Sequence, residues 1–188
     1  MNALITQQLL ERLSALLRNE MRGLAGDAGL QPVQCDALYY LSHCNRYSDT
    51  AKAVTDFLGL TKGTVSQSLK VLEKKGLIEK QPDTEDRRIV HLHLTPEGNK
   101  LVDQLMPSPM LGSAISGFSD QQTQSVEESL SELLKVLQAQ NGMRSFGQCR
   151  SCRHNQKLES GGYFCNLTKE ALSVDEIELI CREHEELG

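Results

Sequence analysis

Apolar residues near the start of the chain recur every three or four positions, which is the pattern of one face of an α-helix. The pattern predicts a helix over residues 2–22, interrupted by the glycine-containing segment 23–29. A second helix is expected over residues 32–44, because Pro32 suits the first turn of a helix. The leucines that carry the first pattern include Leu9, Leu13, Leu16 and Leu17.

Two shorter helices follow across a tight turn. Ser48 or Asp49 is suited to cap a helix that runs to Leu58, and Gly59 begins the turn. The next helix ends at Gly76. Two short helices joined in this way form a helix-turn-helix, which we expect at about residues 49–76. Its buried positions are expected to include Val65, Leu69 and Leu72.

Alternation of apolar and polar residues then replaces the helical spacing. Residues 77–81 and 88–94 have the period of half-buried strands, and Pro82 and Asp83 lie between them. The alternation predicts a β-hairpin, or wing, at about residues 77–95.

Prolines mark the starts and breaks of the helices predicted in the second half of the chain. Thr95 and Pro96 suit a helix start, and Pro107 and Pro109 break or kink the helix that begins there. A last long helix follows Ser119. Because this helix and the first one are apolar on one face, they need a partner, and a second copy of the chain would supply it. The sequence therefore predicts a homodimer.

Composition narrows the classes of function. The chain has 188 residues, 39% hydrophobic, which is enough for one domain and an appendage. We expect a cytoplasmic protein without a membrane partner, because no apolar run approaches roughly 20 residues and the N-terminus lacks a signal-peptide pattern. No catalytic triad, phosphate-binding loop or nucleotide fingerprint is evident, so we do not expect an enzyme and assign no catalytic residue.

The helix before the wing has the composition of a DNA-recognition helix. Such a helix needs an apolar face toward its own domain and small polar or cationic side chains toward base edges and phosphates. The net charge of the chain is −5, whereas residues 62–88 contain seven lysines or arginines and five acidic residues. The basic strip is therefore local, and double-stranded DNA is the expected partner. The candidate DNA-contacting residues are Lys62, Thr64, Ser66, Gln67 and Lys70.

Three segments resemble the MarR family of transcriptional regulators. They are residues 58–80, the run Asp83-Thr-Glu-Asp-Arg-Arg and the run Leu94-Thr-Pro-Glu-Gly. The resemblance covers roughly residues 1–140. It implies an obligate homodimer whose terminal helices form the interface, a recognition helix in the major groove and a wing tip in the minor groove. On this pattern Arg88 matches the family's minor-groove arginine, and Asp86 matches the acid that orients the wing. Arg87 is expected to contact a phosphate.

The end of the chain departs from the MarR pattern. Cys149 and Cys152 are separated by two residues, and Cys165 and Cys181 follow. Two sulfurs so spaced can bind one ion while distant segments supply the other ligands. We expect these four cysteines to hold a metal, with His184 as the reserve ligand. Zinc is favoured over an iron-sulfur cluster because the Cys-x-x-His ending suits zinc, although four thiolates serve either.

These expectations give a mainly α-helical fold with a small β-wing. A winged helix-turn-helix with N- and C-terminal dimerisation helices is expected over residues 1–142, and a cysteine-rich metal-binding module over residues 143–188. The expected function is that of a regulator, a repressor, that binds an inverted-repeat operator. A small-molecule effector, or the metal or redox state of the module acting through the last helix, would modulate it. The alternative is a metal-dependent redox protein that uses the winged helix as a scaffold or as a protein-interaction module.

Four further residues are given structural interpretations. Cys35 and Cys44 lie on a helix that faces the core, and some MarR proteins sense oxidants through a cysteine. Free cysteine is more often a small buried apolar residue, which is how we interpret both. His91 and His93 alternate with Leu92 and should therefore point to solvent.

Overall fold

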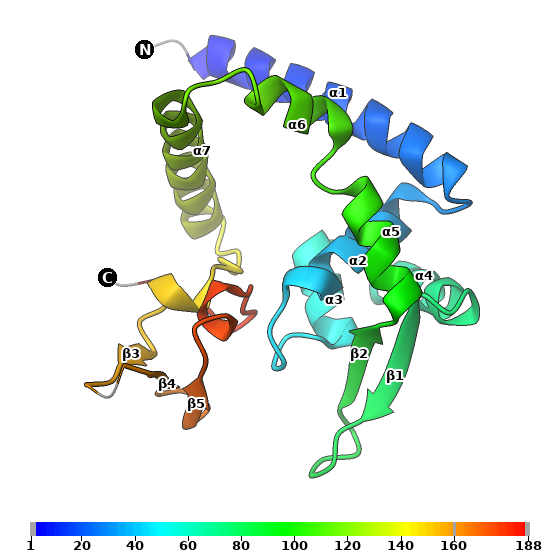
Figure 1. Cartoon of the computed structure of the whole chain (residues 1–188), viewed down its shortest axis with the longest axis vertical. Coiled ribbons are helices and arrows are strands. Elements are labelled where there is room, and N and C mark those ends of the chain that lie inside the picture. Colours follow the sequence, from blue (N-terminus) through cyan, green and yellow to red (C-terminus); the bar gives the residue numbers. More distant parts are fainter. Residues whose placement is uncertain (1–2, 160, 187–188) are drawn as a thin grey trace.

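Figure 1 shows the computed structural model, which describes residues 3–159 and 161–186. Seven α-helices of the described chain and a two-stranded sheet precede the cysteine-rich part. In order these elements are α1 (Ala3–Asp27), α2 (Pro32–His43), α3 (Ala51–Leu58), α4 (Lys62–Lys74), β1 (Ile78–Pro82), β2 (Val90–Leu94), α5 (Pro96–Leu105), α6 (Pro109–Ile115) and α7 (Asp120–Gln140). The mainly helical fold with a small antiparallel sheet is confirmed.

Helix α1 is longer than the sequence pattern predicts. It continues through Gly23 and Gly26 and ends at Asp27, whereas we expected an end at residue 22; Asn2, where we expected it to begin, lies outside the described residues. The added turn is held by packing, because Ala25 is fully buried against the core formed by α2 to α5. The helix-breaking tendency of glycine, about 1 kcal/mol per residue, is smaller than that gain of tertiary contact.

The helix-turn-helix consists of α3 and α4. Thr50 caps α3 by accepting a hydrogen bond from the backbone N–H of Ala53 at 3.3 Å. The prediction of Ser48 or Asp49 as the cap was therefore wrong by one or two positions. Gly59 ends α3 with a φ of +62°, a conformation that favours glycine, and Thr61 caps α4.

The wing is an antiparallel hairpin that continues directly into α5. Strands β1 and β2 pair in the register Ile78 with Leu94 and Pro82 with Val90. Gly98, in the first turn of α5, lies close to the start of β1: a Cβ atom at this position would stand 2.1 Å from the carbonyl oxygen of Leu77. Only glycine permits this approach, which sets the angle between the wing and α5.

One apolar core joins the helices of the winged helix. Tyr40 of α2 is fully buried, and its ring packs at 4.5 Å from Phe57 of α3. Cys35 is buried and Cys44 is half-buried, in line with the structural interpretation of both. Phe146, from beyond α7, packs edge-on against Phe57 at 5.2 Å, so the end of the chain returns to this core.

Helices α6 and α7 present apolar faces that the chain itself does not cover. Along its full length α7 has no buried residue. Its exposed apolar side chains include Val126, Leu130, Leu134 and Leu137, and those of α1 include Leu9, Leu13 and Leu16. Within the described residues, none of the helices combines the length and apolar character needed to cross a membrane.

Residues 143–159 and 161–186, which we call the cysteine module, form a small second unit at the foot of α7 (Figure 1). Its antiparallel sheet has the order β3 (Asn155–Lys157), β4 (Tyr163–Cys165), β5 (Glu170–Leu172). Two short 3-10 turns, η1 (Cys149–Ser151) and η2 (Glu176–Glu178), complete it. Its buried cluster of Cys149, Leu172 and Ile177 is small and also takes in Tyr47 from the α2–α3 turn.

Candidate DNA interface and cysteine site

Helix α4 has one buried and one exposed face. Its inward residues are Val65, Ser68, Leu69 and Leu72. All five candidate DNA-contacting residues, Lys62, Thr64, Ser66, Gln67 and Lys70, are exposed. The helix therefore presents a polar and cationic surface that begins at its N-terminus, where backbone N–H groups also attract phosphate.

The wing tip is a tight loop built around two aspartates. Asp83 accepts hydrogen bonds from the backbone N–H groups of Glu85 and Asp86, at 2.8 and 2.6 Å. Asp86 in turn accepts from the Arg88 side chain through Nε at 2.9 Å and a terminal nitrogen at 2.7 Å. These bonds hold the pKa of the Asp86 carboxyl below its usual range. The Arg88 side chain is 90% exposed, so Asp86 orients a cation that projects from the loop.

His91 is not a solvent-facing residue, which corrects the sequence interpretation. Its ring bridges two carboxylates, with Nδ1 2.6 Å from Asp49 and Nε2 3.1 Å from Asp83, and its side chain is only 20% exposed. The hydrogen bond to Asp49 raises the pKa of His91. His93 stacks beside it at 6.1 Å and is more exposed. The bridge was invisible in the sequence because Asp49 is 42 residues away.

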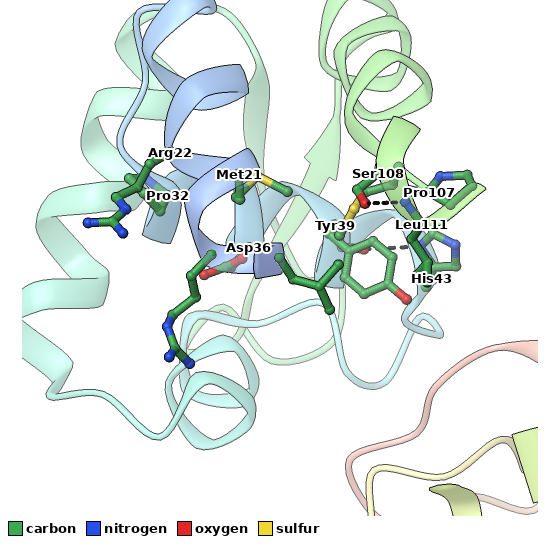
Figure 2. Close-up of a pocket in the computed structure, with 12 residues that line it drawn as sticks. Met21, Arg22, Pro32, Asp36, Tyr39, His43, Pro107, Ser108 and Leu111 are labelled. Atoms are coloured by element: carbon green, nitrogen blue, oxygen red, sulfur yellow. Dashed lines mark hydrogen bonds between the residues drawn. The ribbon is translucent and has the colours of Figure 1, made fainter. Parts of the chain in front are cut away.

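A cavity of about 740 Å³ lies among α1, α2 and the α5–α6 connection. Figure 2 shows Asp36 and Tyr39 of α2 between Met21 of α1 and Leu111 of α6. Arg18 and Arg22 add positive charge at the α1 side, and burial raises the pKa of Asp36. Sequence reasoning assigned none of these residues to a binding site, because three separate helices supply them.

The four cysteines of the module, Cys149, Cys152, Cys165 and Cys181, line a second cavity of about 30 Å³. All four are free thiols. The neighbouring Cys149 thiol lowers the pKa of Cys181. In the described part of the chain, no group of three or more His, Cys, Asp or Glu side chains is arranged to hold a metal ion as it stands.

The two histidines of the module lie in different places. His184, the expected reserve ligand, does not line the cysteine cavity, and its two ring nitrogens contact the hydroxyls of Ser145 and Ser151 at 2.6 and 3.0 Å. His154, which sequence reasoning missed, does line it. The spacing Cys152-x-His154 was the signal that could have identified it.

The chain is similar to known proteins both in sequence and in structure. Residues 28–89 match the model of the MarR family. The organic hydroperoxide resistance transcriptional regulator of Bacillus subtilis is 30% identical over 92 residues, which are 49% of this chain and 63% of the relative. The transcriptional repressor MprA of Escherichia coli is 26% identical over 132 residues, 68% of this chain and 74% of the relative.

Two solved structures similar to this chain contain DNA. The Staphylococcus aureus MepR–DNA complex is 25% identical with a TM-score of 0.57, and the match covers 71% of this chain and 98% of that one. Streptococcus pneumoniae FabT in complex with DNA is 27% identical with a TM-score of 0.57, covering 72% and 96%. The family-model match, these relatives and these structures show that the chain is similar to MarR-family winged-helix transcriptional regulators.

Proposed function

We propose that this protein is a cytoplasmic transcriptional repressor that binds an inverted-repeat operator as a homodimer. The observation that carries the proposal is the exposed polar face of α4 next to a wing whose Arg88 is oriented by Asp86. Helix α4 enters the major groove with Gln67 among its base-contacting residues, and Arg88 enters the adjacent minor groove, where negative potential is concentrated. A binding role of this kind needs no catalytic residue.

The dimer is assembled through α1, α6 and α7. Their exposed apolar residues, such as Leu13, Leu111 and Leu134, need a cover, and the matching helices of a second copy provide it. Two-fold symmetry then places the two α4 helices one helical turn of DNA apart, roughly 10 base pairs.

A small effector binds the cavity beside α1 and modulates this activity. The volume of about 740 Å³ is within the range of ligand pockets, roughly 300–1,000 Å³. Apolar walls from Met21 and Leu111 and the cations Arg18 and Arg22 suit an apolar molecule with an anionic group. Because α1 and α6 also carry the dimer face, an occupant would change the spacing of the two α4 helices.

The test is selection of duplex DNA by the full-length protein, followed by affinity measurements on variants. We expect an inverted repeat. Arg88→Ala should weaken binding about tenfold, remove the preference for A/T-rich flanks and lower the salt slope by about one per subunit. Gln67→Ala should instead change the preferred base at one position of each half-site. The matched control is Arg150→Ala, which removes the same charge from the cysteine module and should leave affinity unchanged.

A footprint on DNA of the size expected for one subunit would contradict the proposal that a homodimer binds the operator. If Arg88→Ala and Gln67→Ala each lowered affinity by the same factor on every DNA sequence, the two residues would contribute to affinity but not to sequence recognition.

A further inference from the structure

The fold gathers four thiols from separate segments around one small cavity. Cys149 belongs to η1, Cys152 follows it, Cys165 ends β4, and Cys181 comes after η2. All four line the same space of about 30 Å³. A module whose buried apolar cluster is so small has little else at its centre to stabilise it.

Polar atoms around the same cavity lack partners. His154 Nε2 and Asn155 Oδ1 are buried without a hydrogen bond, and both residues line the cavity. The nearest ionic neighbour of His154 Nε2 is the Glu185 carboxylate, 3.5 Å away. Buried polar atoms are rarely left unpaired, so these two atoms beside four thiols distinguish this cavity from the apolar core of the winged helix.

We propose that the cysteine cavity binds one zinc ion through the thiolates of Cys149, Cys152, Cys165 and Cys181. Zinc favours four such ligands in tetrahedral arrangement. Because the thiols are not arranged to hold an ion as they stand, binding requires a change of rotamer at one or more of these cysteines. His154 replaces His184 as the reserve ligand, because only His154 lines the cavity. The small volume of the cavity favours a single ion over an eight-atom iron-sulfur cluster.

The winged helix supplies an outer partner of this site. Asn45, in the turn between α2 and α3, is only 3% exposed, and its Nδ2 donates to Cys149 Sγ at 3.5 Å. A donor to a thiolate stabilises the charged ligand and orients it, and loss of such a partner typically weakens metal binding 10- to 100-fold. Asn45 is thus a positioning residue from outside the module.

The same turn, residues 43–50, connects the module to the wing. On one side Asn45 N–H donates to the Ile180 carbonyl at 2.9 Å, and Arg182 N–H donates to Ser48 Oγ at 2.9 Å. On the other side the Asp49 carbonyl accepts from the N–H of Leu92 in β2 at 2.8 Å. Zinc that orders the module therefore also holds the turn against which the wing is seated, provided that it binds this closed arrangement more tightly than an open one.

The site is tested first without DNA. Full-length protein is purified anaerobically, stripped with a chelator and titrated with zinc in competition with a chromophoric chelator. We expect one zinc per chain. Cys152→Ser and Cys165→Ser should each lose at least tenfold in zinc affinity, and Asn45→Ala should lose 10- to 100-fold while keeping the stoichiometry. Cys35→Ala is the matched control, since it removes a cysteine from the core of the winged helix and should keep full zinc affinity.

Failure of the stripped wild-type protein to take up zinc overturns the proposal, whatever the folding of the variants. Protein that carries iron with acid-labile sulfide, or a disulfide among the four cysteines in place of metal, overturns it too. So does equal zinc loss in Cys35→Ala, because the effect would then be general unfolding.

The coupling is tested by hydrogen exchange of zinc-loaded and stripped wild-type protein. The amides of Asn45, Ile180 and Arg182 should exchange at least tenfold more slowly with zinc, whereas that of Tyr40 in α2 should not change. Equal exchange at the turn in both forms refutes the coupling. The effect on operator affinity rests on the proposed DNA-binding function, but zinc stoichiometry and exchange do not, so the two can fail separately.

Discussion

The ion pair between Arg182 and Asp56 makes the docking of the cysteine module measurable. Arg182 of the module donates to Asp56 Oδ2 of α3 through Nε at 2.8 Å and a terminal nitrogen at 2.6 Å. The perturbation is a double-mutant cycle of Arg182→Ala, Asp56→Ala and the double variant. Arg182 also contacts the Glu183 carboxylate, and the cycle cancels that contribution.

The size of the coupling follows from the burial of the pair. The Arg182 side chain is 13% exposed and that of Asp56 is 33% exposed. Exposed pairs contribute about 0.2–1 kcal/mol, and breaking a buried pair costs about 3–5 kcal/mol. An intermediate pair with two hydrogen bonds should give a coupling of about 1–2 kcal/mol, which changes the equilibrium for opening the module roughly 5- to 30-fold.

The assay is hydrogen exchange by mass spectrometry on the full chain, following the peptides that contain Asn45 and Ile180. Their backbone hydrogen bond joins the winged helix to the module, and it reports opening directly. The matched control is a cycle of Arg150→Ala and Glu178→Ala, a pair within the module at 3.1 Å whose side chains are 59% and 48% exposed. Its coupling should stay below about 0.5 kcal/mol.

An Arg182–Asp56 coupling no larger than that of the control would refute the reasoning. The module would then not be held against α3 by this ion pair, and its attachment to the winged helix would rest on the hydrogen bonds to the α2–α3 turn.

Two further predictions concern the wing and the dimer. The hydrogen bond to Asp49 raises the pKa of His91, so the stability that protonated His91 contributes is present below pH 6.5 and is lost as pH rises through the folded pKa. The difference in unfolding free energy between wild type and His91→Gln, less than about 1 kcal/mol, should therefore shrink from pH 6 to pH 8. A difference that grows with pH would contradict this prediction. Leu134 lies on the exposed apolar face of α7, so Leu134→Glu should raise the dimer dissociation constant, measured by sedimentation, at least tenfold. Ser125→Glu, on the opposite face of α7, should leave this constant unchanged. Equal dissociation constants for the two variants would exclude α7 from the interface.

Much of the winged helix could be predicted from local patterns alone. The spacing of Val65, Leu69 and Leu72 identifies the buried side of α4 because a helix repeats every 3.6 residues, and its polar candidates are all exposed as that geometry requires. The prolines at 107 and 109 separate α5 from α6 as expected. The end of α1 was missed because burial of Ala25 outweighs the glycines around it.

The sequence by itself determined the identities of the candidate functional side chains: the polar face of α4, the pair Asp86 and Arg88, and four cysteines at ligand spacing. Only the tertiary structure decided what these groups face. It seated His91 between two aspartates, placed His154 and not His184 at the cysteine cavity, and docked the module on the α2–α3 turn where we had expected an effect through the last helix. The physical reason is that hydrogen bonds such as Asn45 to Cys149 join residues about a hundred positions apart, and no local periodicity records which distant partner will satisfy a buried polar group.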